Sequence, residues 1–303
     1  MKISDLFYTQ KPFPSLEIVP PLGGMSKDEL LSNIEPLMEF HPRYINVTTH
    51  RDEYRYVAQP DGSFSREVVN SRVSPVAVCA SVQQRFDIEV VPHIICGGVT
   101  AGDISRLLQD FRYMGIDNVM ALRGDSLADE KRFTPTPGGY SHASELVAAI
   151  RAAGDFCIGV GAYPEKHFEA PNLETDIAFL KAKVDAGADY IITQMFFDND
   201  VFFRFRDMCM AAGIEVPIIP GLKPLVTKSQ LKLLPEAFSL DIPLELCESI
   251  SACADDDAGS IRRTGVDWCI RQTRGLLEAG VPAVHYYTMS KSASVAAVLR
   301  ECF

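Results

Sequence analysis

The sequence predicts an α/β fold, a single (β/α)8 barrel (TIM barrel) over residues 1–303, and three observations favour it. Eight short segments are rich in apolar and β-branched residues, and most are followed by an amphipathic stretch, as in parallel βαβ units. Several amphipathic stretches stop at a glycine, where helices often end. Eight such units in a chain of 303 residues fit a barrel with an N-terminal extension.

The predicted strands follow one another along the whole chain. In order they span residues 15–19, 44–48, 89–94, 118–122, 156–162, 190–193, 217–219 and 283–287. The helix expected over residues 101–114 places Ile104, Leu108 and Phe111 on one face, with Thr100 or Asp103 as its candidate N-cap. Further helices, each followed closely by a glycine, are predicted over residues 174–186, 198–212 and 256–278.

An open, doubly wound sheet is the alternative architecture. Such a sheet often carries a glycine-rich nucleotide-binding turn after its first strand. Here that turn reads PPLGGMS (residues 20–26), which is neither G-x-G-x-x-G nor a P-loop. The barrel is therefore the preferred prediction.

Composition narrows the function classes and the partners. A formal net charge of -11 argues against a nucleic-acid partner, because neutralising phosphates needs a surplus of Lys and Arg. No apolar run reaches the roughly 18 residues of a membrane helix, and the N-terminus lacks a signal-peptide layout, so we expect a cytoplasmic protein without a membrane partner. The eight cysteines show no C-x-x-C spacing and are interpreted as reduced packing residues. The sequence leaves the oligomeric state open, and a homo-oligomer is compatible with it.

Polar side chains gather where the predicted strands end, and the carboxyl ends of the strands are where barrel enzymes place their active sites. The seventh strand ends in Pro220-Gly221, where bare backbone could approach a ligand closely. In strand order, the polar residues are Glu17, Thr48, His93, Arg123 with Asp125, Tyr163 with Glu165 and His167, and Gln194.

Glu17 is the sharpest candidate among them, because it lies between Leu16 and Ile18 inside a predicted strand. Burial would raise the pKa of its carboxyl toward the range that is useful for an acid at neutral pH. The alternative is a carboxylate paired with an arginine across the barrel interior, and strand position alone does not decide between the two.

Each of the other candidates also has a purely structural interpretation. Asp125 could cap the helix that follows a tight Arg123-Gly124-Asp125 turn, His93 could be a core histidine bonded to backbone, and Tyr163 could only pack. Cys96 near His93 is weak evidence for a nucleophile. No metal is expected, because the histidines and aspartates show no H-x-H or H-E-x-x-H spacing.

At these same positions the sequence resembles the methylenetetrahydrofolate reductase family over nearly the whole chain. Singly the matching pieces mean little, but in this order, each at a strand end, they form a specific signature. The pieces are SLEIVPP (15–21), NVTT (46–49), VPHIIC (91–96), ALRGD (121–125), AYPEKH (162–167), KVDAGADYIITQMFFD (183–198), IIPGLKP (218–224) and HYYTM (285–289).

The resemblance implies a barrel that holds FAD non-covalently and reduces 5,10-methylenetetrahydrofolate to 5-methyltetrahydrofolate with NADH or NADPH in a ping-pong sequence. Glu17 matches the acid that protonates the folate ring, and Asp125 matches an aspartate close to flavin and folate. Gln194, Gln230 and Lys291 match folate-contacting positions. The positions matching FAD contacts are Thr48, His93, Arg123, Gly124, Asp125, Ala143, Tyr163, His167, Asp176 and Lys183.

The chain departs from the family pattern around the second strand and the substrate rim. Thr49 and His50 replace a tyrosine and a glycine, and the loop that follows, through residues 59–62, is enlarged. Lys291 replaces an arginine, which keeps the charge but loses the bidentate fork, and Leu234 replaces an aromatic residue. These departures bear on nicotinamide choice and folate affinity rather than on the reaction class.

Two other function classes stay open on the sequence alone. One is a flavin-free barrel lyase or pterin-binding methyltransferase that uses Glu17 and Asp125 as an acid and base pair. The other is a folate-binding or regulatory protein without catalysis. Bound flavin that NADH or NADPH reduces would separate the reductase from both.

Overall fold

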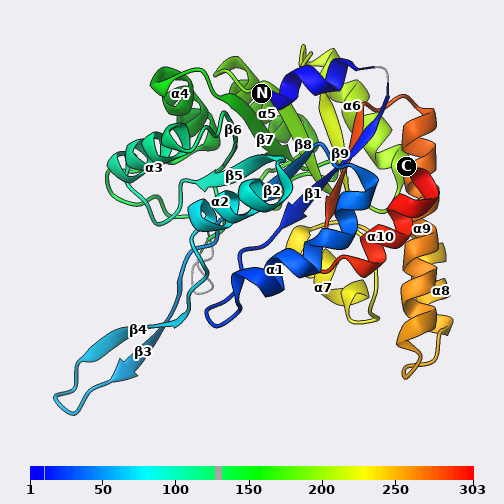
Figure 1. The fold of residues 1–303 in the computed structure, drawn as a ribbon, viewed down its shortest axis with the longest axis horizontal. Coiled ribbons are helices and arrows are strands. Elements are labelled where there is room, and N and C mark those ends of the chain that lie inside the picture. Colours follow the sequence, from blue (N-terminus) through cyan, green and yellow to red (C-terminus); the bar gives the residue numbers. More distant parts are fainter. Residues whose placement is uncertain (10, 127–131) are drawn as a thin grey trace.

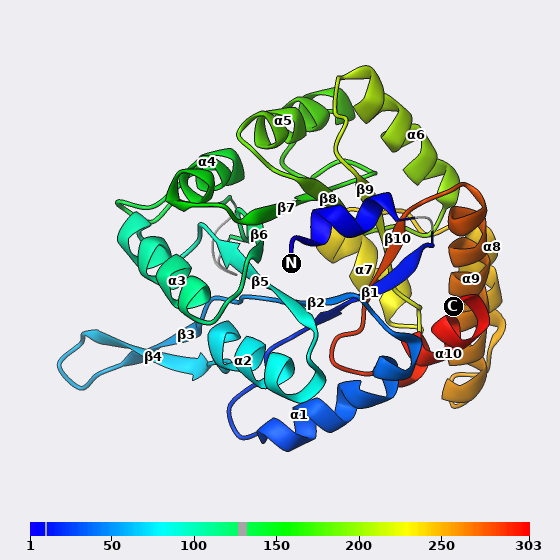
Figure 2. The same ribbon diagram turned by 45° about the horizontal axis from the view of Figure 1, so that its top comes forward.

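A computed structural model of the protein describes residues 1–9, 11–126 and 132–303, and it confirms the predicted barrel. Eight parallel strands close in the order β1-β10-β9-β8-β7-β6-β5-β2, with helices around the outside (Figures 1 and 2). The barrel strands are β1 (Phe13–Ile18), β2 (Tyr44–Val47), β5 (Glu89–Ile95), β6 (Asn118–Leu122), β7 (Cys157–Ala162), β8 (Tyr190–Met195), β9 (Ile218–Leu222) and β10 (Ala283–Tyr287).

The connections between the strands carry the helices. They are α1 (Lys27–Ile34), α2 (Pro75–Phe86), α3 (Ala101–Tyr113), α4 (Ala143–Ala153), α5 (Leu173–Asp185), α6 (Asn199–Ala211), α7 (Gln230–Phe238), α8 (Leu244–Ala252), α9 (Ala258–Glu278) and α10 (Ala293–Cys302), with 3-10 helices η1 (Ile3–Tyr8) and η2 (Glu35–Phe40). None of the helices in the described ranges has the length and apolar character needed to cross a bilayer.

The helix ends follow the local signals in the sequence. Thr100 caps α3, because its hydroxyl accepts from the backbone of Asp103 while the Asp103 carboxylate accepts from the backbone of Thr100. Gly187 follows α5 with φ +116°, a conformation that side chains other than glycine rarely adopt. The cap and stop predictions are therefore confirmed at both helices.

The amino-terminal end of the barrel is closed by packing. Helix η1 lies across it (Figure 2) and contributes Ile3, Leu6 and Phe7 to an inner core. The Phe7 ring contacts Tyr44 of β2 and Tyr190 of β8, which lie on opposite sides of the barrel. Its centroid is 6.3 Å from that of the Tyr44 ring and 5.3 Å from that of the Tyr190 ring. Because this end is filled by side chains, a ligand can enter the barrel only from the carboxyl end.

The enlarged loop after β2 is a structured arm. It forms an antiparallel ribbon of β3 (Glu53–Ala58) and β4 (Phe64–Asn70) that projects away from the barrel (Figure 1). Gly62 turns the chain between the strands with φ +83°. At its base the backbone N–H of Gly23 donates to the carbonyl of Ser71. Leu22 and Arg72 form an isolated antiparallel β-bridge beside it. The base of the arm is thus fastened to the loop that follows β1.

Candidate active site

Glu17 points into the carboxyl end of the barrel from β1, where it lies level with Tyr287 of β10 and Asn46 of β2. Its neighbours Leu16 and Ile18 face the opposite way and are fully buried in the outer core, as strand alternation requires. The Glu17 side chain is 13% exposed, so it opens onto the barrel mouth rather than lying sealed in the core.

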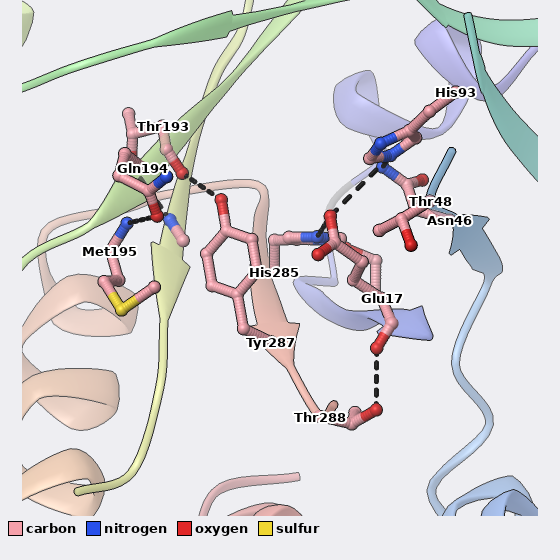
Figure 3. Close-up of polar contacts among 12 residues, drawn as sticks. Glu17, Asn46, Thr48, His93, Thr193, Gln194, Met195, His285, Tyr287 and Thr288 are labelled. Carbon is pink, nitrogen blue, oxygen red and sulfur yellow. Dashed lines mark hydrogen bonds and ion pairs between the residues drawn. The ribbon is translucent and has the colours of Figure 1, made fainter. Parts of the chain in front are cut away.

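Two histidines flank the Glu17 carboxylate (Figure 3). Oε2 of Glu17 lies 3.6 Å from Nε2 of His93 and 3.8 Å from Nε2 of His285. Among the described residues no arginine pairs with Glu17, so the arginine alternative from the sequence is wrong. The carboxylate instead belongs to an imidazole–carboxylate–imidazole cluster drawn from β1, β5 and β10.

This cluster corrects the expected direction of the Glu17 pKa. Burial raises the pKa of the carboxyl as expected, but the imidazoles of His285, His93 and His50 together lower it by more, and the net pKa lies below its ordinary value. Burial in turn lowers the pKa of His93 to about 4, so His93 is neutral at physiological pH. The titration of Glu17 is therefore coupled to that of the imidazoles beside it.

Both histidines are held by side chains from the neighbouring strand. Oγ of Ser15 lies 2.9 Å from Nδ1 of His285, and Nδ2 of Asn46 lies 3.2 Å from Nε2 of His93. The core-histidine interpretation of His93, bonded to backbone, is thus wrong for its ring. Nε2 of His285 and Oδ1 of Asn46 are buried with no hydrogen-bond partner among the described residues. Such orphaned polar atoms are costly unless a ligand satisfies them.

Tyr287 stands beside Glu17 on the neighbouring strand β10, and Gln194 lies beyond it on β8 (Figure 3). The hydroxyl of Tyr287 donates to the carbonyl of Thr193 at 2.7 Å, and Oε1 of Gln194 accepts from the backbone of Met195 at 2.9 Å. The Gln194 amide NH2 remains to donate to a ligand. The expectation that Gly221 leaves space for a ligand is wrong. A Cβ there would lie 2.2 Å from the Thr193 carbonyl and 2.7 Å from the Tyr287 ring. Gly221 makes room for protein.

The segment after β2 is fastened at successive residues. Thr49 donates to the carbonyl of His93 at 2.5 Å, and Nε2 of His50 lies 2.9 Å from the hydroxyl of Thr48. Burial and the charge of Arg72 lower the pKa of His50, while the carboxylates of Glu17 and Asp125 act to raise it. His50 therefore reaches into the same site. The sequence identified it only as a departure from the family, and the missed signal was its place two residues after Thr48.

The residues after β6 form a charged corner. Arg123 pairs with Glu169 and lies over the Phe133 ring, 4.9 Å from its centroid. Gly124 has φ +83°, which favours glycine. The helix-cap interpretation of Asp125 is wrong, because α4 begins at Ala143 with His142 as its N-cap.

The predicted positions on β7 and α5 also converge. The rings of Tyr163 and His167 meet edge to face at 4.7 Å, and Asp176 accepts from the backbone of His167 at 2.9 Å. Nζ of Lys183 donates to the carbonyl of Gly161 at 2.5 Å, and burial lowers the pKa of this lysine to about 8. One face of α5 thus meets the end of β7, as the seven-residue spacing of Asp176 and Lys183 predicts.

The remaining predicted residues lie further out. Gln230 begins α7, and its Oε1 accepts from the backbones of Val226 and Thr227 at 2.7 and 3.0 Å. Lys291 is exposed on the turn after β10, and Ala143 opens α4. No group of three His, Cys, Asp or Glu within the described ranges is placed to hold a metal ion.

Comparison with known proteins agrees with this geometry. The sequence profile of the family described as methylenetetrahydrofolate reductase matches residues 2–302. The chain belongs to this family. It is 32% identical over 279 residues to the 5,10-methylenetetrahydrofolate reductase of Escherichia coli (strain K12), with 92% of this chain and 86% of the relative aligned.

Other relatives extend the comparison in length and in fold. The chain is 30% identical over 306 residues to methylenetetrahydrofolate reductase 1 of Schizosaccharomyces pombe, covering 99% of this chain but 48% of that protein. A solved structure of a Clostridium thermocellum protein shares the fold, with a TM-score of 0.64 at 15% identity over 100% of this chain and 98% of that one. Membership of the methylenetetrahydrofolate reductase family makes the protein an oxidoreductase that acts on folate.

Proposed function

We propose that the protein reduces 5,10-methylenetetrahydrofolate to 5-methyltetrahydrofolate with NADH or NADPH, in a ping-pong sequence through bound FAD. The observation that carries this proposal is the Glu17 carboxylate between His93 and His285, facing Gln194 across the mouth of the barrel. Such a cluster combines a proton donor with an amide that can hold a pterin ring.

The residues present fit FAD along one arc of the mouth, from β2 through β7. The end of this arc at β2 and β5 holds the orphaned Oδ1 of Asn46 beside His93, and its other end holds the buried Lys183. Thr48, His93, Arg123, Gly124, Asp125, Ala143, Tyr163, His167, Asp176 and Lys183 would hold the cofactor. When bound, FAD would supply hydride transfer between the nicotinamide and the folate.

Glu17 would deliver the proton that opens the folate imidazolidine ring to its 5-iminium cation. In the free protein the flanking imidazoles favour the carboxylate, so the bound substrate would have to raise the pKa of Glu17 before it acts as the acid. His285 is placed to orient the carboxylate, because Ser15 fixes its Nδ1 and leaves Nε2 toward Glu17. The protein thereby holds the Glu17 carboxylate in one defined orientation.

Asp125 would stabilise the positive charge that develops on the folate as the iminium forms. The charge of Asp125 acts to raise the pKa of His50 and of Tyr163, which follow β2 and β7 at the mouth. Gln194 would donate its amide to the pterin, and Gln230 and Lys291 would contact other parts of the substrate.

The test is an anaerobic flavin titration of the purified protein. We expect yellow protein whose flavin absorbance is bleached by NADH or NADPH and restored by 5,10-methylenetetrahydrofolate. Colourless protein that takes up no added FAD would instead favour the flavin-free lyase or methyltransferase. Flavin that bleaches but is never restored by folate would favour a binding protein without catalysis.

A further inference from the structure

Arg51 is a charged residue at the base of the arm that neither the family resemblance nor the proposed mechanism uses. It lies between β2 and β3, on the first of the two connections that join the arm to the barrel. The connection is fastened beside it, because Thr49 donates to the carbonyl of His93 at 2.5 Å. Arg51 is half-buried, although arginine side chains are mostly exposed unless they are paired. The barrel, rather than the free part of the arm, thus fixes its position.

The side chain of Arg51 lies against the backbone that follows β5. A Cβ atom on Gly97 would lie 3.2 Å from Cδ of Arg51 and 3.4 Å from its Nη1, and a Cβ atom on Gly98 would lie 3.2 Å from its Nε. The two glycines therefore make room for the guanidinium group directly on their main chain. Because this packing orders the arginine before a ligand arrives, less side-chain entropy is lost when it binds one.

One nitrogen of the guanidinium group lacks an acceptor. Nη1 of Arg51 is buried and has no hydrogen-bond partner within the described residues. A buried donor that has left water without finding an acceptor costs free energy, and it costs more when the group is charged. An anion that accepts from Nη1 would remove this cost, so the orphaned nitrogen points to a ligand.

The charges around Arg51 favour an anion. Cε2 of Phe133 would lie 3.3 Å from the same Cβ atom on Gly97, so Arg51 and Phe133 meet over this glycine. Arg123 lies over the Phe133 ring, 4.9 Å from its centroid, and it pairs with Glu169. The corner thus brings two guanidinium groups to one aromatic ring, and its paired carboxylate belongs to Arg123. Arg51 is the cation that an anionic ligand would complete.

We propose that Arg51 binds a phosphate group of a dinucleotide at the mouth of the barrel. The inference rests on the proposed function, which places FAD along the arc from β2 through β7. FAD is the favoured source of the phosphate, because Arg51 follows β2, packs on the chain that follows β5 and lies in the same corner as Arg123. The planar fork of a guanidinium group can donate two parallel hydrogen bonds to one phosphate.

A carboxylate of the folate is a poorer match for Arg51. Two of the predicted folate contacts, Gln194 on β8 and Gln230 after β9, lie across the closed barrel from β2 and β5. NADH and NADPH carry phosphates as FAD does, and these phosphates have the same chemistry toward a guanidinium group. The experiment is therefore designed to separate the three dinucleotides.

The experiment compares the release of FAD from the FAD-loaded wild type and from Arg51→Met. Each protein is diluted at several salt concentrations, and free FAD is followed by the rise in flavin fluorescence. We expect Arg51→Met to release FAD about tenfold faster, because a charge-assisted hydrogen bond is lost. Salt should accelerate release less in the variant than in the wild type, since one fewer charge pair is screened. Arg55→Met is the matched control and should behave like the wild type, because Arg55 pairs with Glu67 at 3.0 Å on the arm.

Displacement by riboflavin, which carries no phosphate, shows which part of FAD Arg51 contacts. The riboflavin concentration that displaces half of the bound FAD should fall about tenfold in Arg51→Met, because only FAD loses a contact. Faster release of FAD with an unchanged riboflavin concentration would mean that Arg51 supports the flavin ring instead, and this would overturn the inference.

Gly97→Ala tests the contact without removing the arginine. Gly97 has an ordinary backbone conformation, but its new methyl group would take the space of Cδ of Arg51 and push the flexible side chain aside. We expect faster release of FAD from this variant. The double variant Gly97→Ala/Arg51→Met should release FAD no faster than Arg51→Met alone, because both changes remove the same contact. Additive effects would contradict the packing of Arg51 on this glycine.

The KM values for NADH and NADPH identify the source of the phosphate. A contact with FAD leaves both values unchanged in Arg51→Met. Wild-type release of FAD with a higher KM for NADPH alone would assign Arg51 to the 2′-phosphate, and an equal rise for NADH and NADPH would assign it to their pyrophosphate. Wild-type release of FAD together with wild-type KM values would overturn the inference. A wild-type protein that holds no flavin at all would refute the proposed function itself.

Discussion

Oγ of Ser15 lies 2.9 Å from Nδ1 of His285, although the two residues are 270 positions apart. Ser15 and Glu17 share one face of β1, so the same strand holds the imidazole and presents the carboxylate to its other nitrogen. His285 can thus keep one orientation through a catalytic cycle. This arrangement makes the acidity of Glu17 depend on a neighbour that a substitution can remove.

The first prediction concerns the pH dependence of folate reduction. The half-reaction needs Glu17 protonated, so its rate falls as pH rises through the Glu17 pKa. The imidazole of His285 lowers that pKa, and replacing it with the neutral amide of His285→Asn leaves burial less opposed. We expect the falling limb to move to higher pH. Stopped-flow reoxidation of the reduced flavin by 5,10-methylenetetrahydrofolate across pH measures it.

Ser15→Ala is the graded companion of that variant. It keeps the imidazole but frees Nδ1, so the limb should move in the same direction by a smaller amount. If His285→Asn leaves the limb in place, the histidine does not set the acidity of Glu17.

Replacing the acid itself should separate the two half-reactions. Glu17→Gln keeps the size of the side chain but removes the proton, so folate reduction should fall by about 10²–10⁴-fold. Flavin reduction by the nicotinamide, which needs no acid, should be unchanged. Rapid-mixing rates for each half-reaction decide the matter, with Glu39→Gln as the control because Glu39 pairs with Arg300 on the outside. An equal loss in both halves would contradict the acid role.

The barrel could be predicted from the sequence because each strand has its own signal. Residues 119–122 form a continuous apolar run, and the strand predicted over residues 118–122 has the bounds of β6. The arm of β3 and β4 could not be predicted in the same way. Apart from Val57 and Ser65, which are half-buried, every residue of the two strands is exposed, so neither strand alternates between a buried and an exposed side. A ribbon in solvent on both faces has the polar, glycine-containing composition of a loop.

The sequence predicts which residues of the site lie at strand ends, but it does not predict which of them contact one another. A parallel barrel brings all its carboxyl ends to one mouth, which is why Glu17, His93 and Gln194 meet. The pairing of Glu17 with His285 depends on closure between the first and last strands, and no local pattern reveals it.

Gly221 provides a prediction about stability. A methyl group at this position would lie 2.2 Å from the Thr193 carbonyl, where the backbone cannot yield easily. We expect Gly221→Ala to lower the free energy of unfolding by about 1–3 kcal/mol, measured by urea denaturation. It should also raise the KM for folate, because the Tyr287 ring would be displaced. Gly23→Ala is the control, since its nearest atom would be the Ser71 carbonyl at 4.0 Å, and an equal effect of both variants would contradict the packing argument.

The arm offers a last prediction, about which parts of the chain stabilise the barrel. Its two strands pair only with each other, and they lie outside the closed sheet. Replacing residues 54–69 with a short Gly-Ser linker should therefore shift the melting temperature by only a few degrees and leave the FAD content unchanged.

The base of the arm should behave differently. Arg72 donates to the carbonyl of Pro20 at 2.9 Å, and the backbone of Val73 donates to Pro21 at 3.0 Å, so these contacts hold the loop that leaves β1 just after Glu17. We expect Arg72→Ala, with the arm intact, to slow folate reduction more than the deletion does, because it loosens the support of the acid. Thermal unfolding and both half-reaction rates, compared across the two variants, check this. A deletion that unfolds the barrel would show that the arm itself stabilises the fold. An Arg72→Ala variant with wild-type folate reduction would show that the base of the arm does not support Glu17.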